Sequence, residues 1–352
     1  MQRFLKILRD NFLILLGILT LVSISILVLY SIAPSLFPIY FVYLILALIA
    51  FIILSQIDFE VISLFGNHFY VLSLIILMVT LLIGRVTRGT IRWIPLGPLS
   101  IQPAEIVRPF LFIFFANYLS SQNLKLGKFL KAIILLGIPV FLIFIQPSLG
   151  VSLLTIAGFI GILLASTINK KYFLFATLGL LALAPLFWLI LAPYQKTRIL
   201  TFLEPWQDPK GAGYNAIESM ISVGSGGWWG KGLGKGTGTQ LSFLPERQTD
   251  FIYAATAEEL GFVGVGLILV AEGIILLGLI RIMENSRSPQ ARAFVAGFFL
   301  TFFLQTFIHI GMNIGILPIT GVPLPLVSAG GSSLLATFMG LAIALGAKKE
   351  IT

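Results

Sequence analysis

Residues 11–31 read NFLILLGILTLVSISILVLYS and contain no charged residue. A transmembrane helix needs about 20 consecutive, mostly apolar residues, so this run is long enough to cross a bilayer. The whole chain has the same character, because 58% of its 352 residues are hydrophobic and only 11% are charged. So few charges cannot form a water-facing surface, which excludes a soluble globular enzyme, a disordered tail and a coiled coil. The sequence therefore predicts a polytopic α-helical membrane protein.

The composition also excludes several kinds of site. There is no cysteine, so a disulfide, a thiolate nucleophile and a Cys-ligated zinc ion are all excluded. Only two histidines are present, which excludes a multi-histidine metal centre. The net charge of +9 would suggest nucleic-acid binding in a soluble protein. In a membrane protein it reflects the excess of Lys and Arg in cytoplasmic segments, and we expect no nucleic-acid partner.

Nine further apolar stretches follow the first. We predict ten transmembrane helices, at about 11–31, 37–55, 69–84, 103–119, 129–146, 149–167, 172–192, 251–280, 292–312 and 327–347. The fifth and sixth are separated only by Gln146-Pro147-Ser148, where proline favours a tight turn. The fold expected is thus all-α, with one membrane domain over residues 1–352 and a large extracytoplasmic loop, 193–250, between helices 7 and 8.

The basic residues indicate which side of the membrane each segment occupies. Ten spans place both termini on one side, and cytoplasmic termini put 13 of the 23 Lys and Arg residues inside: Arg3, Lys6, Arg9, Lys125, Lys128, Lys131, Lys170, Lys171, Arg281, Arg287, Arg292, Lys348 and Lys349. Four arginines break this rule in a short outer stretch, namely Arg85, Arg88, Arg92 and Arg108. A rule broken at a cost usually marks a functional site.

Glu105 and Arg108 place two charges in the fourth span, where each costs about 2.5–3.5 kcal/mol on insertion scales. Three residues apart on a helix, they share one face. They either neutralise each other to lower the cost of insertion or line an outward-facing polar cavity. Arg88, Arg92 and Trp93 stand just upstream, and guanidinium groups suit phosphate. We favour a cavity for the diphosphate headgroup of a lipid.

Residues 224–238 read GSGGWWGKGLGKGTG, with a glycine at eight of fifteen positions. The stretch matches neither the Walker pattern nor G-x-G-x-x-G, so it does not indicate a nucleotide site. A flexible loop is one interpretation. We favour another, in which backbone amides, Lys231 and Lys235 approach an anionic ligand while Trp228 and Trp229 lie at the bilayer surface.

The next stretch, FLPERQTDFIY (243–253), places Asp250 at the outer end of the eighth span. Asp250 is either the N-cap of that helix or a general base at the outer membrane surface. The helix dipole and nearby Arg247 both favour the ionised carboxylate. Glu258 and Glu259, two turns further on, are expected to be buried and hydrogen-bonded within the bundle.

The last loop, ILPITGVPLPLVSAGGSS (316–333), has three prolines and three glycines at membrane depth. Irregular backbone is tolerated there only inside protein or against a cavity. We expect this loop to form part of the wall of the outer cavity, with Ser328 among the residues that bind substrate.

Five motifs together resemble one family. They are RWxxLGxxxxQPAExxRP (92–109), QPSLG (146–150), GSGGWWGKGLGKGTxTQ (224–240), FLPERQTDFIYAxxAEELG (243–261) and GVPLPLVSAGGSS (321–333). In this order they closely resemble the SEDS proteins, the shape, elongation, division and sporulation glycosyltransferases of bacterial peptidoglycan synthesis. The match spans nearly the whole chain. Its details resemble the rod-shape branch of the family, RodA, more than the division branch, FtsW.

The resemblance implies ten transmembrane helices and an enzyme that polymerises lipid II into β-1,4 glycan strands at the outer face of the bacterial cytoplasmic membrane. Asp250 matches the family's essential aspartate, and Glu105 and Arg108 match its Glu and Lys in the fourth helix. Arg92 matches the arginine before Trp. In the mechanism we expect, Asp250 deprotonates the 4-hydroxyl of the acceptor sugar and the donor reacts with inversion. The arginines, with Lys231 and Lys235, offset the charge of the departing diphosphate.

This sequence departs from the family pattern at four positions. Gln248 replaces the usual His, Arg108 replaces Lys, Ser148 replaces Asp and Ala329 replaces Tyr. None of these changes removes Asp250, so we still expect activity.

A divalent cation, Mg²⁺ or Mn²⁺, is a candidate for sharing the charge on the diphosphate, although the sequence shows no carboxylate cage for one. We expect no organic cofactor. The partners implied are lipid II, membrane lipids and a class B penicillin-binding transpeptidase. Two alternatives are a flippase of lipid II and a non-catalytic scaffold for the transpeptidase. A flippase should show inverted repeats with broken helices, which this sequence lacks.

Overall fold

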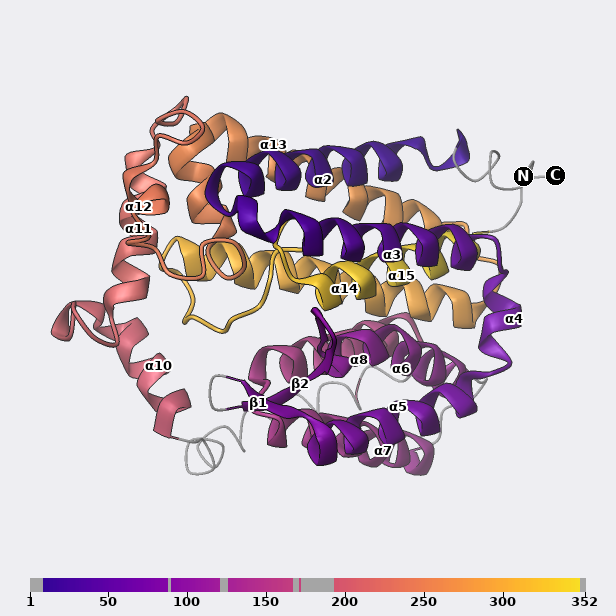
Figure 1. Ribbon diagram of the computed structural model, residues 1–352. Helices are drawn as coiled ribbons and strands as arrows, with labels where there is room; N and C mark the ends of the chain where they lie inside the picture. The colour runs from indigo at the N-terminus through magenta and orange to yellow at the C-terminus, as the bar shows by residue number, and fades with distance from the viewer. Residues whose placement is uncertain (1–8, 88–89, 121–125, 167–170, 172–192, 349–352) are drawn as a thin grey trace.

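The structure is a computed structural model that describes residues 9–87, 90–120, 126–166, 171 and 193–348. Most of these residues lie in helices (Figure 1). The helices are α2 (Phe12–Ile32), η1 (Pro34–Leu36), α3 (Phe37–Ser55), α4 (Phe59–Ser63), α5 (Gly66–Ile83), α6 (Pro103–Leu119), α7 (Leu126–Ile145), α8 (Leu149–Ala165), α10 (Pro193–Leu203), η2 (Pro205–Gln207), α11 (Tyr214–Ser225), α12 (Thr237–Gln240), α13 (Ile252–Glu284), α14 (Pro289–Asn313) and α15 (Gly331–Gly346).

Six helices of the described chain are long and apolar enough to cross a membrane: α2, α3, α5, α7, α13 and α14. They coincide with six of the predicted spans and identify a multi-pass membrane protein. Helices α6, α8 and α15 coincide with three more, but they have only 17, 17 and 16 residues. The predicted span 172–192 lies outside the described residues. The tight turn predicted at Gln146-Pro147-Ser148 is confirmed, because α7 ends at Ile145 and α8 begins at Leu149.

Glycines allow the long helices to pack closely. A Cβ added to Gly161 of α8 would lie 2.5 Å from the carbonyl oxygen of Ala296 in α14. A Cβ added to Gly278 of α13 would lie 2.2 Å from the side-chain Cγ1 of Ile14 in α2. In a bilayer such small residues let helix backbones approach, because lipid gives helices little hydrophobic reason to associate. Elsewhere the helices expose leucine, isoleucine and phenylalanine, as lipid-facing surfaces do.

The helices form two groups with α14 and α15 between them (Figure 1). Helices α5, α6, α7 and α8 make up one group, and α2, α3 and α13 make up the other. Helix α14 contacts α6 and α8 on one side and α13 on the other, while α15 contacts α6 and α3. Among the described residues, α14 and α15 therefore bring side chains of the two groups together.

The expectation of an all-α chain is wrong in one place. Strands β1 (Arg85–Thr87), β2 (Thr90–Leu96) and β3 (Leu99–Ile101) form a small antiparallel sheet. Strand β2 contains threonine, isoleucines and tryptophan, which favour extended backbone. Gly97 then takes a φ of 63°, the left-handed conformation that a two-residue hairpin turn requires at its first position. Arg92 therefore lies on a strand, and Arg88 lies outside the described residues.

The 193–250 segment is folded into helices. Helices α10, α11 and α12 lie at one end of the bundle, and α11 packs against α13 and α14 (Figure 1). The opposite end holds the start of α2 and the residues after α15, where Lys348 Nζ donates to the Asp10 carbonyl oxygen at 3.0 Å. The described ends of the chain are thus together, far from α10–α12.

Candidate active site

Asp250 ends a tight turn that precedes α13. The carbonyl oxygen of Glu246, a residue with φ of 51°, accepts hydrogen bonds from the amides of Thr249, Asp250 and Phe251 at 3.0, 3.1 and 3.3 Å. Helix α13 begins at Ile252, and its N-cap position is Phe251. The interpretation of Asp250 as the helix N-cap is therefore wrong, because the turn displaces it by one residue from that position. Its side chain is half-buried.

Arg247, on the same turn, points toward α2. Its Nε and Nη2 both donate to the carbonyl oxygen of Ile32, at 3.2 and 3.1 Å, and its Nη1 donates to Ser242 Oγ at 2.7 Å. A cation suits this position because Ile32 ends α2, where carbonyl groups lack helical partners. Arg247 thus attaches the Asp250 turn to α2, a role that the sequence analysis did not assign to it.

Asn313, the last residue of α14, fixes the backbone beside Asp250. Its Nδ2 donates to the carbonyl oxygens of Asp250 at 3.0 Å and His309 at 2.8 Å. Its Oδ1 accepts the Ala254 amide at 3.1 Å, and its carbonyl oxygen accepts a bond from Ser219 Oγ at 2.9 Å. Asn313 is fully buried. Through its side chain and its backbone carbonyl group, this one residue joins α11, α13 and α14 at the position of the candidate base.

The 316–330 loop packs directly against the Asp250 turn, in keeping with its predicted place in the wall of the site. The Ala329 amide donates to the Gln248 carbonyl oxygen at 2.9 Å. Ser328 Oγ donates to the Thr249 carbonyl oxygen at 2.7 Å and accepts the Leu324 amide at 2.8 Å. Ser328 is thus buried and braces the loop, and its contact with substrate stays a prediction.

Gly321 of this loop lies beside the candidate base. Its φ of 69° favours glycine, and a Cβ at this position would come within 3.4 Å of Asp250 Oδ2. The next residue, Val322, offers its carbonyl oxygen to His309 Nδ1, which donates at 2.8 Å. The histidine therefore holds the loop where its glycine leaves room alongside the carboxylate.

Arg108 of α6 reaches the same loop through one glutamine. Its Nη2 donates to Gln305 Oε1 at 3.2 Å, and Gln305 Nε2 donates to the Pro323 carbonyl oxygen at 3.0 Å and to Ser333 Oγ at 3.1 Å. Arg108 is 4% exposed, and its Nη1 has no hydrogen-bond partner among the described residues. The structure thus links the predicted arginine to the loop that covers Asp250.

Glu105 lies close to both arginines that the sequence analysis grouped with it. The carboxylate is buried, and both Arg108 and Arg92 attract it electrostatically. Within the described residues, however, Glu105 and Arg108 form no direct ion pair, because Arg108 donates to Gln305 instead. Glu105 and Arg108 thus attract each other without a direct ion pair, and their lining of an outward-facing polar cavity stays a prediction.

Gln102 attaches the start of α6 to two other parts of the site. Its backbone amide donates to Ser332 Oγ at 2.7 Å, and its Nε2 donates to Ser148 Oγ at 3.0 Å. Ser148 stands where the family pattern has Asp, so the serine hydroxyl keeps a hydrogen-bond acceptor without adding a buried charge. Gln102, Gln305 and Asn313 were not predicted from the sequence, because an uncharged amide in a span lacks the large insertion cost that marks a charged residue.

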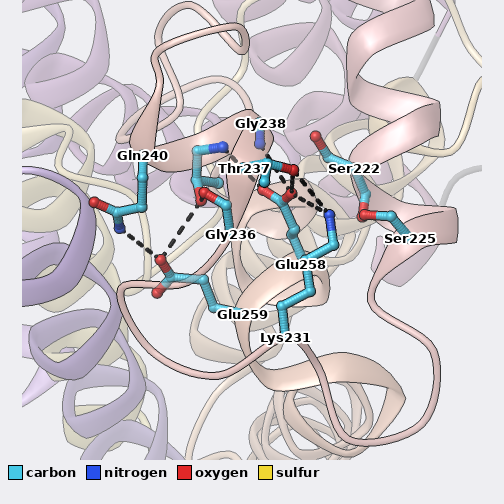
Figure 2. A network of polar contacts seen from close by, with 10 residues as sticks. Ser222, Ser225, Lys231, Gly236, Thr237, Gly238, Gln240, Glu258 and Glu259 are labelled. Atoms are coloured by element: carbon cyan, nitrogen blue, oxygen red, sulfur yellow. Dashed lines mark hydrogen bonds and ion pairs between the residues drawn. The ribbon is translucent and has the colours of Figure 1, made fainter.

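Lys231 belongs to a second polar cluster, shown in Figure 2. Its Nζ lies 2.7 Å from Oε1 of Glu258, which also accepts the Gly238 amide at 3.0 Å. Oε2 of Glu258 accepts the Thr239 amide at 2.9 Å. These two amides of α12 therefore do bind an anion, but that anion is a carboxylate of the protein itself. Lys235 is exposed.

Glu259 extends this cluster on its other side (Figure 2). Its Oε1 accepts bonds from the Gly234 amide at 3.2 Å and from Gln240 Nε2 at 2.8 Å. Both glutamates are buried, as predicted. The bonds come from the glycine-rich loop and α12, partners that the sequence prediction did not specify.

The glycine-rich loop, residues 224–238, is held against a break in α13. Gly261 interrupts that helix with φ of 66° and ψ of −164°. A Cβ on Gly261 would lie 2.2 Å from the Gly230 amide nitrogen, and one on Gly226 would lie 1.8 Å from the Ala257 carbonyl oxygen. The Lys231 amide also donates to the Glu258 carbonyl oxygen at 2.9 Å. These backbone contacts do not fit a flexible loop.

Two further predictions about this region stay predictions. Trp228 and Trp229 are 70% and 81% exposed, and Trp228 contacts Phe262 edge-on, which suits the bilayer surface proposed for them. Within the described residues no three His, Asp or Glu side chains gather as ligands of a metal ion.

Comparisons with known sequences agree on one family. Residues 4–352 match the family of cell cycle proteins that comprises FtsW, RodA and SpoVE. The peptidoglycan glycosyltransferase MrdB of Escherichia coli K12 is 35% identical over 303 residues, which cover 85% of this chain and 82% of MrdB. The probable peptidoglycan glycosyltransferase FtsW of Aliivibrio salmonicida is 36% identical over 291 residues, covering 80% of this chain and 71% of FtsW.

Solved structures give the same result. The rod shape determining protein RodA of Thermus thermophilus superposes with a TM-score of 0.72 and 27% identity over 95% of this chain and 94% of its own. A chain from a peptidoglycan synthase complex, described as coordinating polymerization and crosslinking, superposes with a TM-score of 0.83 and 29% identity. That match covers 94% of this chain and 95% of the other.

Proposed function

The chain belongs to the FtsW, RodA and SpoVE family of cell cycle proteins, and on this premise we propose how its buried charges act in glycan synthesis. The protein is a peptidoglycan glycosyltransferase of the SEDS type that polymerises lipid II. The observation that carries the mechanism is the half-buried Asp250, held by Asn313 on one side and by the 316–330 loop on the other.

The membrane arrangement follows from the same premise. One membrane domain over residues 1–352 crosses the cytoplasmic membrane ten times, with both termini in the cytoplasm and the 193–250 segment outside. The described ends of the chain lie opposite α10–α12, which supports this orientation (Figure 1). The cluster of basic residues predicted inside supports it as well.

Asp250 acts as general base in a single displacement. It takes the proton of the acceptor sugar's 4-hydroxyl while that oxygen attacks the anomeric carbon of the donor. The bond from the anomeric carbon to the diphosphate oxygen breaks, so an α-linked donor gives a β-1,4 product with inversion. One base and a stabilised leaving group suffice, in contrast to the carboxylate pair of a glycoside hydrolase.

The arginines stabilise the departing diphosphate. Arg108 has a buried nitrogen that makes no hydrogen bond within the described residues, so it can donate to an oxyanion without giving up a bond. Arg92 supplies a second guanidinium, and Glu105 keeps both in position through electrostatic attraction. Lys231 and Lys235 complete the predicted set, although Lys231 already has Glu258 as its acidic partner.

The protein acts in elongation and works with a crosslinking enzyme. The relatives include MrdB and a rod shape determining protein, which supports elongation, while the FtsW relatives keep division as the alternative. The match to a chain from a peptidoglycan synthase complex supports a class B penicillin-binding transpeptidase as partner. Complementation of a strain depleted of its elongation polymerase would distinguish elongation from division.

Polymerisation of purified lipid II in detergent tests the mechanism. Asp250→Asn should abolish glycan formation, because the amide cannot accept the proton, while thermal unfolding stays close to that of the wild type. Asp208→Asn is the matched control, since Asp208 is exposed and lies outside the site. Glycan of normal length and rate from Asp250→Asn would refute the assignment. A chelator, followed by Mg²⁺ or Mn²⁺, added to the same assay tests the proposed divalent cation.

A further inference from the structure

A basic cavity lies at the end of the bundle opposite the candidate active site. It has a volume of about 160 Å³ between the start of α2 and the end of α13. Three cationic side chains line it, Arg9, Arg281 and Lys348, together with Asp10. Three positive charges less one negative charge leave the cavity with a net charge of +2. The space is sufficient for a phosphate group.

Two of these cations are available to a ligand. Arg281 lines the cavity and is exposed. Arg9 is 81% exposed at its side chain and makes one long contact, from Nε to Asp10 Oδ1 at 3.5 Å. Lys348 is already bound to the Asp10 carbonyl oxygen and to Asn11 Oδ1, at 3.0 and 3.2 Å. Lys348 therefore holds the start of α2 in place at the cavity, whereas the two arginines are exposed.

An apolar groove continues from the cavity along α2. It has a volume of about 390 Å³ and is lined by Arg9, Phe12, Leu15, Leu16 and Leu19. Arg9 and Phe12 line both the cavity and the groove, so the two spaces are contiguous. Leu19 and Phe12 are more than half exposed, on a helix that crosses the membrane.

We propose that the cavity binds the headgroup of an anionic phospholipid, and that the groove along α2 receives one of its acyl chains. The order of the two spaces matches that of a phospholipid at a membrane surface, with the charged part at the helix ends and the apolar part along the span. Basic pockets at the cytoplasmic ends of helices bind such headgroups through the attraction of Lys and Arg for phosphate.

The groove favours a lipid over a soluble anion. Inorganic phosphate would use the cavity alone and would leave Leu15, Leu16 and Leu19, which line the groove but not the cavity, without a ligand. The lipid belongs to the cytoplasmic leaflet if the proposed orientation holds. None of the lining residues belongs to the catalytic set, so the lipid site can be tested independently of the polymerase mechanism.

Native mass spectrometry of the full chain, released from nanodiscs of phosphatidylcholine with increasing phosphatidylglycerol, tests the proposal. The wild type should retain one phosphatidylglycerol in preference to phosphatidylcholine. Arg9→Gln combined with Arg281→Gln should weaken that retention about tenfold, since each basic residue near a membrane surface contributes to binding of anionic lipid. The matched control is Lys131→Gln with Arg292→Gln, two exposed residues predicted cytoplasmic but outside the cavity, which should behave as the wild type.

Leu16→Trp provides a second variant that leaves every cation in place. A large ring in the groove should reduce retention of phosphatidylglycerol and leave any binding of inorganic phosphate unchanged. The proposal would be overturned if the wild type retained both lipids equally, or if the arginine variant and its control retained phosphatidylglycerol equally. It would also be overturned if inorganic phosphate alone displaced all of the retained phosphatidylglycerol. Polymerisation of lipid II in detergent should be normal in the arginine variant, and Asp250→Asn should still retain the lipid.

Discussion

At the scale of single residues, an uncharged amide positions the charged base. Asn313 donates to the backbone of Asp250 and of His309, and it accepts the amide of Ala254. A leucine of similar size would leave buried backbone groups without partners, which costs about 1–3 kcal/mol for each. We therefore class Asn313 as a positioning residue for Asp250.

Asn313→Asp should lower kcat for glycan polymerisation about tenfold with a smaller effect on KM, because the carboxylate cannot donate to the two carbonyl oxygens. Asn285→Asp is the matched control, since Asn285 is exposed and its Nδ2 makes one bond, to the Arg281 carbonyl oxygen at 2.8 Å. Steady-state kinetics with purified lipid II measures both variants. An unchanged kcat for Asn313→Asp would refute this role.

Gly321 gives a second prediction at this scale. Gly321→Ala places a Cβ 3.4 Å from Asp250 Oδ2, so it should reduce polymerisation at least tenfold. Gly227→Ala is the control, because Gly227 also has a positive φ but a Cβ there meets nothing within 4 Å. Both changes carry similar backbone strain, about 1–2 kcal/mol. Equal activity of the two variants would show that the space beside Asp250 does not matter.

The charged residues of the site could be predicted from the sequence, and the amides could not. Glu105, Arg108 and Asp250 stand out because charge within or beside an apolar span is costly. Asn313 and Gln305 carry no such signal, since a polar amide is common near helix ends and its partners lie far away in sequence. The N-cap position of α13 was also mispredicted as Asp250. The turn before this helix depends on a positive φ at Glu246, which the sequence pattern does not predict.

At the scale of elements, the break in α13 and the glycine-rich loop form one unit. Gly261 bends the helix, so that Glu258 and Glu259 face the loop and α12. Both glutamates were predicted to be buried and hydrogen-bonded, without specified partners. A helical pattern predicts which residues are buried, whereas the partner of a buried carboxylate depends on where the chain returns.

Glu258→Gln tests this unit. The change keeps the shape of the side chain but removes the charge that pairs with Lys231 and weakens the bonds from two loop amides. Because Glu258 is 1% exposed, we expect the free energy of unfolding to fall by about 2–3 kcal/mol. Thermal unfolding in detergent measures this change.

The matched control for Glu258 is Glu218→Gln on α11, a half-buried glutamate outside the cluster, and it should change stability little. Limited proteolysis should also cut the 224–238 segment faster in Glu258→Gln than in the control. Equal cleavage rates would show that the loop is held by its backbone contacts alone.

At the scale of the whole molecule, the absence of cysteine allows the orientation to be tested cleanly. Single cysteines at the exposed positions Asp208 and Asn285 lie in the 193–250 segment and at the end of α13. A membrane-impermeant maleimide applied to intact cells should label Asp208→Cys, while Asn285→Cys should react only after the membrane is permeabilised. Labelling of Asn285→Cys in intact cells would contradict the proposed orientation.

The membrane-spanning helices could be predicted from the length of their apolar stretches. The parts of the fold that are not long apolar helices could not. Six predicted spans coincide with helices long enough to cross a membrane. The sheet at 85–101 was missed because its strands are short and follow a span directly. Sequence patterns also cannot show that α14 and α15 separate two groups of helices, since that arrangement depends on packing between distant segments.

The bridge through Gln305 has a mechanical consequence. The proton acceptor comes from one half of the bundle and the guanidinium from the other, and a single glutamine spans the seam between them. A displacement of about 1 Å at a reacting group can cost a hundredfold in rate. We therefore expect that displacement of α6 from α14 would lower the rate of polymerisation without any direct contact with the reacting groups.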